Sequence, residues 1–353
     1  MFLSLQKTLR SLAPGTPLRE GLEYILRART GALIVVGDSR QVMELVDGGF
    51  KMDSEYTPSS LYELSKMDGA IILSQDARRI IYANVQLNPD PAIPSQETGI
   101  RHRTAERVAR QTGELVIAIS QRRNVVTLYK GSSKYELKDI PYILTKANQA
   151  IQTLEKYRAV LNQALSNLSA LEFEDLVTVV DVATVLVRTE RVLHVMKEIE
   201  SYIDELGTEG RLVNMQLEEL VADVEEESNL IIRDYFVPTD NLTPEEVRQQ
   251  LAEGASDDLL DVVAVSRILG YGSSLTTLEH SVSPRGYRIL RKIPRLPMSV
   301  IENLVQGFGN LQRILGASIE ELDRVEGIGG VRARAIKDGL RRFRDQVLLD
   351  RHI

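Results

Sequence analysis

The sequence of 353 residues contains no cysteine and only four histidines. Without cysteine there is no disulfide and no thiolate metal site, so any metal must be held by oxygen atoms or by one of these histidines. The missing disulfides agree with a reducing compartment. No apolar run is long enough to cross a bilayer, and residues 1–15 lack a signal-peptide core. We therefore expect a cytoplasmic protein that does not contact a membrane.

Familiar catalytic motifs are absent as well. The sequence contains neither GxxxxGKS/T nor GxGxxG, the glycine-rich patterns of the common nucleotide-binding loops. It also lacks GxSxG, and no Ser/His/Asp arrangement can be assembled by motif. Any phosphate-binding site in this chain must therefore follow a different pattern.

The net charge of −7 is distributed unevenly along the chain. Residues 1–140 carry 19 Lys and Arg against 16 Asp and Glu, residues 141–290 carry 12 against 26, and residues 291–353 carry 12 against 8. The two ends are therefore basic and the middle is acidic. This asymmetry favours nucleotide or nucleic acid binding at the ends, although a solvated acidic helical face also explains the middle.

Residues 1–140 alternate between strand and helix patterns. Segments with apolar residues at helical spacing lie between short runs that are rich in Val and Ile. The last two runs are separated by only a few residues, which favours a mixed sheet. We predict an α/β N-terminal domain with a central mixed sheet over 1–140. Its expected strands are 32–37, 69–74, 79–85, 114–120 and 124–129, and its expected helices are 18–29, 59–67 and 104–111.

The middle of the chain has a helical pattern. From residue 142 to 237, Leu, Val and Ile recur at steps of three and four, with no proline between Pro141 and Pro238. We predict an all-α helical spine domain over 141–290, which is either a self-association surface or an ordinary monomeric bundle. The pattern breaks near residue 237 and restarts at Thr243, the expected N-cap of a new helix.

The C-terminal segment ELDRVEGIGGVRARAIKDGLRRFRD begins at residue 321. A helix ending near Val325, a glycine turn and a second helix from Val331 predict a small all-α helix-hairpin-helix domain over 291–353. Residues 303–315 repeat the scheme more loosely. Backbone N–H groups at such a helix N-terminus bind phosphate without reading sequence, although a glycine-capped helical tail is the alternative. The expected DNA-binding residues are Gly327, Gly329, Arg332, Arg334 and Lys337.

The stretch GIRHRTAERVARQTG, residues 99–113, places Arg101, His102 and Arg103 at the expected start of a helix. The helix dipole is already positive there, so an external anion would balance this charge. Arg101 and Arg103 can clamp phosphate oxygens, and Thr104 can either cap the helix or bond a phosphate. A solvated surface turn is the alternative interpretation.

A second motif, MDGAIILS, places Asp68 and Gly69 at the entry to an apolar strand. A carboxylate there, opposite an arginine-rich phosphate site, can hold a divalent cation or accept a proton from a hydroxyl. Alternatively, Asp68 simply ends the preceding helix in a turn.

Together these motifs resemble a known family. DGA at 68–70, GIRHRTAER at 99–107 and LVIAIS at 115–120 resemble the diadenylate cyclase domain. The acidic helical middle and the C-terminal helix-hairpin-helix resemble the DNA integrity scanning proteins that carry this domain. The resemblance covers essentially the whole chain. It implies condensation of two ATP into cyclic di-AMP with release of two pyrophosphates, a cofactor of Mg²⁺ or Mn²⁺, a homo-octamer of two opposed tetramers, branched DNA as a partner, and a nucleoid-associated role in DNA damage and repair.

The resemblance also implies residue roles. Asp68 would lie at the ribose 3′-hydroxyl and its metal, and Asp68, Arg101 and Arg103 would be the catalytic residues. Leu87 would pack on the adenine. Ile100 departs from the pattern, because some members have Thr there, and this chain would then use backbone N–H groups or Thr104 instead. The residues expected to hold the nucleotide are Gly69, Leu87, Arg101, His102, Arg103, Thr104 and Ser120.

Two hypotheses about the whole chain follow. Two nucleotides related by a two-fold axis require two sites face to face, so subunits must associate to react, and DNA at the C-terminus would alter the cyclase through the helical spine. The rival is a non-catalytic DNA-binding scaffold whose N-terminal domain only senses nucleotide. Such a scaffold would be expected to lose Asp68 and keep Arg101 and Arg103; all three are present, which favours the enzyme.

Overall fold

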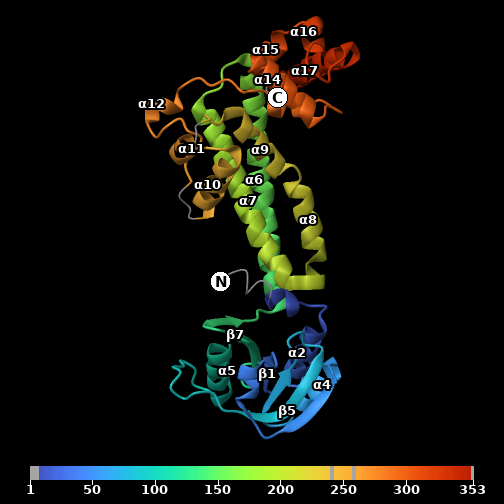
Figure 1. Cartoon of the computed structure of the whole chain (residues 1–353), viewed down its shortest axis with the longest axis vertical. Helices are drawn as coiled ribbons and strands as arrows, with labels where there is room; N and C mark the ends of the chain where they lie inside the picture. The colour runs from blue at the N-terminus through green and yellow to red at the C-terminus, as the bar shows by residue number, and fades with distance from the viewer. Residues whose placement is uncertain (1–7, 239–241, 257–259, 351–353) are drawn as a thin grey trace. The chain divides into compact units, whose positions relative to one another are not determined.

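The computed structural model of this chain describes residues 8–238, 242–256 and 260–350 (Figure 1). The chain forms two compact units. The first comprises Met1–Ala147 and Ser201–Leu212, and the second comprises Asn148–Glu200 and Val213–Ile353. The helices after residue 291 fall in the second unit together with most of the long helical region. The division into three domains at residues 140 and 290 stays a prediction.

The first unit is built on a mixed sheet of eight strands. The strand order is β2-β5-β4-β1-β6-β7-β8, and β3 also pairs with β5. Strands β1 and β4 are parallel and the other pairings are antiparallel, which confirms the predicted mixed α/β sheet. All five predicted strands are present. The bounds are β1 Ala32–Val36, β2 Val46–Asp47, β3 Phe50–Glu55, β4 Ala70–Leu73, β5 Arg79–Leu87, β6 Leu115–Ser120, β7 Val125–Lys130 and β8 Ser133–Glu136.

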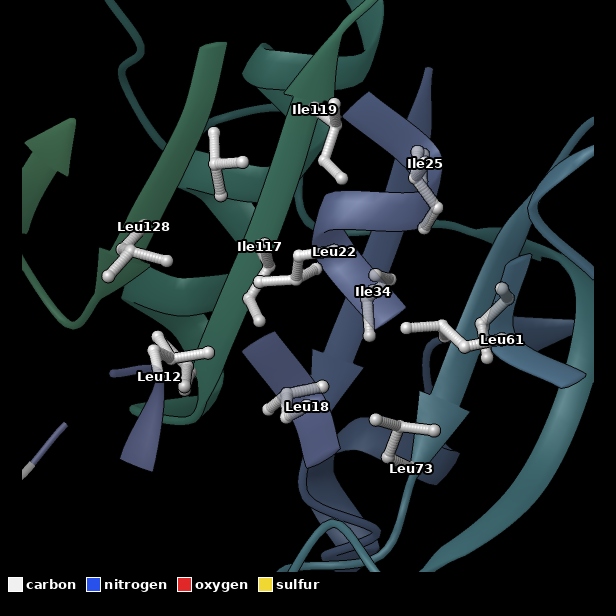
Figure 2. Close-up of a cluster of buried hydrophobic side chains, with 14 of the residues drawn as sticks. Leu12, Leu18, Leu22, Ile25, Ile34, Leu61, Leu73, Ile117, Ile119 and Leu128 are labelled. Carbon is white, nitrogen blue, oxygen red and sulfur yellow. The ribbon is translucent and has the colours of Figure 1, made fainter. Parts of the chain in front are cut away.

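Helices cover both faces of this sheet. On one face, α2 (Pro17–Arg27) and α4 (Pro58–Ser65) pack over a core that includes Ile34 (Figure 2). On the other face, α5 (Ile100–Thr112) packs over a second core that includes Leu33 and Val35. Successive side chains of a strand point to opposite faces, so β1 needs an unbroken apolar run to serve both cores. The same unit contains a short helix, α3 (Arg40–Met43).

The strand directions bring distant segments to one edge of the sheet. The start of β4 lies beside the end of β5, where Ala70 pairs with Val85. The start of β1 lies beside the end of β6, where Ala32 pairs with Ile119. Since β1 and β4 run in the same direction, the residues flanking all four of these strand ends share one edge.

The second unit is helical, as predicted. Helix α6 (Ile140–Glu174) has 35 residues and α7 (Val179–Leu206) has 28. Each of them crosses a boundary between the two units. Thr243 caps α10 (Pro244–Ser256), because its hydroxyl accepts the N–H of Glu246, which confirms the predicted restart. The short helix η1 (Gly207–Gly210) belongs to the first unit, and α8 (Arg211–Val221) begins there and continues into the second. The remaining helices of the second unit before residue 292 are α9 Val224–Tyr235, α11 Val262–Ile268, α12 Leu275–Leu278 and α13 Tyr287–Arg291. Across the described residues, no helix is long and apolar enough to span a bilayer.

The C-terminal helices form two consecutive pairs around a shared apolar core. A turn at Gly309, with φ of +81°, joins the first pair, and a turn containing Gly327, also at +81°, joins the second. The second pair ends its first helix at Asp323 and starts its second at Gly330, close to the predicted positions. The bounds are α14 Met298–Phe308, α15 Leu311–Gly316, α16 Ile319–Asp323 and α17 Gly330–Asp350.

Candidate functional site

An open cleft of about 1360 Å³ lies at the sheet edge where β4 starts and β5 and β6 end. The N-terminus of α5 and the turn between β6 and β7 complete its walls. The structure brings together seven of the residues predicted for the nucleotide site, and Ile100 lies among them. These seven are Asp68, Gly69, Leu87, Arg101, His102, Thr104 and Ser120.

The backbone of Gly69 sets the position of Asp68. Gly69 has φ of +126°, and a Cβ atom on it would lie 2.9 Å from the backbone carbonyl carbon of Asn84 on β5. Only glycine fits both the conformation and this close approach. The neighbouring Asp68 carboxylate is exposed and makes no hydrogen bond or ion pair with the described residues. It is therefore available to a ligand.

Helix α5 begins earlier than the sequence predicts, and its first turn faces the cleft. Gly99 is the N-cap, in an extended conformation with φ of −86°, and no side chain caps the helix. Of the two roles considered for Thr104, capping the helix is wrong, because Thr104 lies one turn inside the helix and lines the cleft. The first N–H groups of a helix have no intrahelical acceptor, so an uncapped N-terminus is a site for an anion.

The guanidinium of Arg101 adds a positive charge to this wall. It makes no hydrogen bond or ion pair with any residue that the structure describes. It packs over Gly31, just before β1, where a Cβ atom would lie 2.1 Å from Nη1. Arg122, from the turn after β6, also lines the cleft. The wall therefore presents positive charge that the chain does not itself neutralise.

Arg103 lies differently from its neighbours. It does not line the cleft, and its guanidinium donates to the carbonyl oxygens of Glu97 at 3.3 Å and Thr98 at 3.5 Å. These bonds hold the segment before α5. The predicted role of Arg103 in binding phosphate stays a prediction, and the structure does not place this residue with the others.

His102 is buried rather than extended into the cleft. Its Nδ1 lies 3.0 Å from the hydroxyl of Tyr129 on β7, and only 8% of the residue is exposed. Burial lowers the pKa of His102 below its ordinary value, and the positive charges of Arg123, Lys134 and Arg101 lower it further against the opposing effect of Glu97. The imidazole is therefore neutral at neutral pH. Sequence reasoning missed Tyr129 and Glu97, whose letters carry no local signal of this contact.

The donor set of the cleft limits how a metal could bind. Within the described ranges, no three or more His, Asp and Glu side chains form a group that could hold a metal ion. Asp68 is a free carboxylate, whereas Glu97 forms an ion pair of 2.6 Å with Lys134. Mg²⁺ commonly binds through one or two carboxylates together with substrate phosphates and water. The residues present therefore fit a metal that arrives with a nucleotide.

The predicted DNA-binding residues lie around the turn before α17. Gly327 and Gly329 are exposed, and Arg332 donates to the carbonyl oxygen of Gly327. Lys337 donates to the carbonyl oxygen of Leu315 at 3.2 Å. Arg334 is exposed and has no hydrogen-bond or ion-pair partner among the described residues. Arg332 therefore supports the turn, Lys337 joins α17 to the end of α15, and Arg334 is free.

Comparison with known proteins identifies relatives over the whole length. Residues 19–134 match the family model described as DisA bacterial checkpoint controller nucleotide-binding, and residues 137–278 match the model described as DisA bacterial checkpoint controller linker region. The chain is 63% identical over 338 residues to the DNA integrity scanning protein DisA of Carboxydothermus hydrogenoformans, covering 96% of each chain. The protein of the same name from Symbiobacterium thermophilum is 63% identical over 347 residues, covering 98% of each. The one from Acetivibrio thermocellus is 57% identical over 344 residues, covering 98% of this chain and 95% of the relative.

Proposed function

Because this chain belongs to the DisA family of bacterial checkpoint controllers, we propose that it is a diadenylate cyclase that condenses two ATP into cyclic di-AMP and two pyrophosphates. One observation carries the proposal. The cleft combines a free carboxylate on Asp68, a free guanidinium on Arg101 and the uncapped N-terminus of α5. The reaction of a nucleoside triphosphate needs positive groups for its anionic phosphates and a carboxylate near the sugar hydroxyl, which must lose a proton.

Different residues of the cleft would contact different parts of the nucleotide. The first-turn N–H groups of α5 and the Arg101 guanidinium would hold phosphate oxygens, and the hydroxyls of Thr104 and Ser120 would add hydrogen bonds. Gly69 would pack against the sugar and Leu87 against the adenine. Arg103 would reach a phosphate only after releasing the carbonyl oxygens that it now bonds.

Asp68 would be placed at the 3′-hydroxyl. The 3′-oxygen forms a bond to the α-phosphorus of the second ATP while the bond from that phosphorus to pyrophosphate breaks, and the hydroxyl proton leaves with a base. Asp68 would also hold Mg²⁺ or Mn²⁺, which when bound would offset phosphate charge. Arg101 would contribute fixed positive charge to the same transition state.

The reaction requires two copies of the chain. Each chain matches one nucleotide-binding family model, and two ATP molecules must face one another for both new bonds to form. We therefore propose a homo-oligomer in which the clefts of two subunits meet, and an octamer as its full assembly. Helices α6 and α7 are the candidates for further self-association.

The C-terminal helix pairs are proposed to bind branched DNA and to alter the cyclase when they do so. The exposed turn at Gly327 and Gly329, followed by α17, offers backbone N–H groups to phosphate, and Arg334 offers a free charge. Such contacts read backbone shape rather than sequence. Since ATP and chromosomal DNA are its substrate and its partner, the same proposal places the protein in the cytoplasm, associated with the nucleoid.

The cyclase is tested by incubating the chain with ATP and Mg²⁺ or Mn²⁺ and identifying the products by mass. We expect cyclic di-AMP from the natural sequence and none from Asp68→Asn or from Arg101→Ala, with the size of the assembly unchanged. Asp338→Asn, an exposed change on α17, is the matched control and should leave synthesis unchanged. If the natural chain binds ATP and assembles yet forms no product with either metal, the cyclase proposal is wrong and the nucleotide-sensing DNA scaffold becomes the favoured function.

The DNA contact is tested separately with a four-way junction and a linear duplex of equal length. We expect Arg334→Ala to weaken binding of both by about the same factor, because a phosphate contact is independent of sequence. Arg267→Ala, a cation on α11, should bind as the natural chain does. Equal binding by Arg334→Ala and the natural chain would contradict the assignment of this residue.

A further inference from the structure

His102 holds one ring nitrogen without a partner beneath the cleft. Its Nδ1 meets the Tyr129 hydroxyl at 3.0 Å, and the two rings meet edge to face with an angle of 67°. Its Nε2 is buried and has no hydrogen-bond partner. An unpaired buried polar atom costs about 1–3 kcal/mol, so a chain that retains one calls for an explanation. The position of His102 in the wall of the cleft suggests that a ligand supplies the missing partner.

A line of polar groups leads from the other ring nitrogen to solvent. The Tyr129 hydroxyl interacts electrostatically with the Glu97 carboxylate, which raises the pKa of Tyr129, and Glu97 in turn forms an ion pair of 2.6 Å with Lys134. The side chain of Glu97 is 13% exposed and that of Lys134 is 45% exposed. The order is therefore Lys134, Glu97, Tyr129 and His102, from the surface inward.

The chemistry of each group fixes the position of every proton. Burial alone would raise the pKa of Glu97, but hydrogen bonds from Lys134 and Tyr129 outweigh it and the pKa is lowered, so Glu97 is ionised and can only accept. Burial raises the pKa of Tyr129, and the nearby Glu97 carboxylate raises it further, so Tyr129 keeps its proton, and the favourable direction for that proton is toward the carboxylate. With its proton in that direction, the Tyr129 oxygen would accept an Nδ1–H from His102 across the 3.0 Å contact. Because a neutral imidazole carries one proton, Nε2 has only a lone pair.

We propose that Lys134, Glu97 and Tyr129 hold His102 as the Nδ1–H tautomer, so that Nε2 takes up a proton and donates it to a phosphate oxygen when a nucleoside triphosphate enters the cleft. This inference rests on the proposed function, since it concerns the same nucleotide. The proton comes from solvent, and no covalent bond between heavy atoms changes. Tyr129 and Glu97 are positioning residues, because they act through His102.

The charges around the ring explain why binding and protonation are coupled. Without nucleotide, the positive charges of Arg101, Arg123 and Lys134 disfavour a positive charge on His102, whereas the Glu97 carboxylate favours it. A triphosphate at the start of α5 would offset Arg101 and Arg123 and would leave the Glu97 carboxylate to stabilise the imidazolium through Tyr129. The same ring is therefore neutral without nucleotide and cationic with it.

The first test measures proton uptake. Calorimetric titrations of the full chain with 3′-deoxy-ATP, which lacks the attacking hydroxyl, are run in buffers of different ionisation enthalpy at one pH. We expect net proton uptake by the natural chain and its loss in Tyr129→Phe and in Glu97→Gln. Tyr135→Phe is the matched control, because Tyr135 also donates to a carboxylate, Glu205 at 2.5 Å, but does not line the cleft. Nucleotide binding without proton uptake would overturn the inference.

The second test observes the tautomer directly. The chain has four histidines, so ¹⁵N spectra of histidine-labelled full-length protein are simple, and His102→Gln assigns the signal. Without nucleotide, we expect Nδ1 to be protonated and Nε2 to be unprotonated. In Tyr129→Phe, we expect a changed ratio of the Nδ1–H tautomer to the Nε2–H tautomer. A protonated Nε2 in the empty natural chain would overturn the inference even if cyclic di-AMP is made. Conversely, the expected tautomer and proton uptake without any product would count against the cyclase alone.

Discussion

Arg101 and Arg103 are two residues apart on α5, yet their guanidinium groups have different surroundings. Arg101 has no protein partner within the described chain and lines the cleft, whereas Arg103 bonds two carbonyl oxygens outside it. In a helix, residues two positions apart point about 200° apart around the axis, so both cannot face one ligand from an undistorted turn. In this structure Arg101 therefore faces the cleft, whereas Arg103 holds the segment before α5.

Gly31→Ala tests how far the position of Arg101 matters. The backbone of Gly31 is ordinary, but the added Cβ would lie 2.1 Å from Arg101 Nη1, and the flexible guanidinium would have to move. We expect the fold to survive and the KM for ATP to rise about tenfold, since a charge-assisted hydrogen bond contributes about 1.5–3 kcal/mol. Steady-state synthesis of cyclic di-AMP measures this. Gly316→Ala, where a Cβ meets nothing within 4 Å, is the control; an unchanged KM would mean that Arg101 acts equally well from elsewhere.

Ile100→Thr tests the departure from the family pattern. Ile100 is the first residue of α5, and 83% of it is exposed at the cleft. A hydroxyl there could donate to a phosphate that the isoleucine cannot bond, and a net gain of about 0.5–1.5 kcal/mol corresponds to a Kd lowered by about two- to tenfold. Titration with 3′-deoxy-ATP measures the change. Ile100→Val keeps the apolar character and should bind as the natural chain does; weaker binding by the threonine variant would rule out a phosphate at this position.

The sequence predicted the members of the site better than their roles. Asp68 and Arg101 could be proposed from their own motifs, whereas Leu87 and Ser120 could be assigned only from the resemblance to the diadenylate cyclase domain. The partner of His102 could not be found this way, because Tyr129 is 27 residues away on another strand. Its role depends on which face of β7 packs under α5, and that is set by tertiary packing.

At the scale of elements, the strands that the sequence analysis did not predict are the outermost strands of the sheet, β2, β3 and β8. β3 is apolar at Phe50 and Met52, but these side chains are 58% and 41% exposed, and the pairing with β5 shifts between Lys51 and Ser54. β2 has two residues and β8 has four. Enrichment in Val and Ile marks strands that are buried on both faces, whereas an edge strand is held by backbone pairing that leaves little trace in composition.

Helix α13 is held by a buried carboxylate rather than by its own sequence. Gly286 is its N-cap and no side chain of the helix caps it, but Asp234 on α9 accepts the N–H groups of Gly286 and Tyr287 at 2.7 Å and of Arg288 at 2.9 Å. The Arg288 side chain, 1% exposed, forms an ion pair with Glu172 on α6. Three elements distant in sequence are thereby joined at the entry to the C-terminal helices.

Asp234→Asn should loosen this junction. The amide keeps one acceptor oxygen but turns an NH₂ group toward a backbone N–H, so at least one buried donor loses its partner. We expect the free energy of unfolding to fall by about 1–3 kcal/mol, measured by chemical denaturation. Asp338→Asn, at an exposed position on α17, is the control and should change little. Unchanged stability in Asp234→Asn would show that the α13 N-terminus does not depend on the charge.

The same residue predicts a dependence on pH. Burial raises the pKa of Asp234 to about 7, with Glu172 raising it and three backbone N–H bonds opposing. The unfolded chain releases this proton near pH 3.9, so between about pH 4 and 7 the folded chain binds more protons and stability falls as pH rises. Denaturation at pH 5 and pH 8 should show a larger difference between the natural chain and Asp234→Asn at pH 5. A difference that grows with pH would contradict the raised pKa.

At the scale of the whole molecule, two features matter: the distribution of charge along the chain and the continuity of α6 and α7. The acidic residues 141–290 repel anions, so we expect nucleotide and DNA to bind at the basic segments on either side. Two helices, α6 and α7, pass from one compact unit into the other without a break. A continuous helix transmits a displacement along its axis better than a flexible linker does, so these two helices are the expected path by which DNA would alter synthesis.

A proline at the unit boundary in α6 would test this path. Gln149 is exposed and follows the boundary between Ala147 and Asn148. Gln149→Pro removes one backbone hydrogen bond and kinks the helix, at a cost of about 3 kcal/mol, without touching the cleft or the C-terminal turn. We expect synthesis without DNA and binding of junction DNA to be retained, and the change in synthesis rate caused by junction DNA to be lost, whichever its direction. Gln149→Ala keeps the helix and should keep the response.

Both outcomes of that comparison are informative because the three readouts are independent. If Gln149→Pro still responds to junction DNA as the natural chain does, α6 does not carry the signal and α7 becomes the path to test. If the natural chain binds the junction with no change in synthesis at any concentration, the proposed coupling is wrong, while the cyclase and the DNA contact stand on their own tests. If junction DNA changes the affinity for 3′-deoxy-ATP, then by reciprocity bound 3′-deoxy-ATP must shift the affinity for the junction by the same factor. Measuring that affinity with and without 3′-deoxy-ATP therefore distinguishes true coupling from an indirect effect of DNA on the assay.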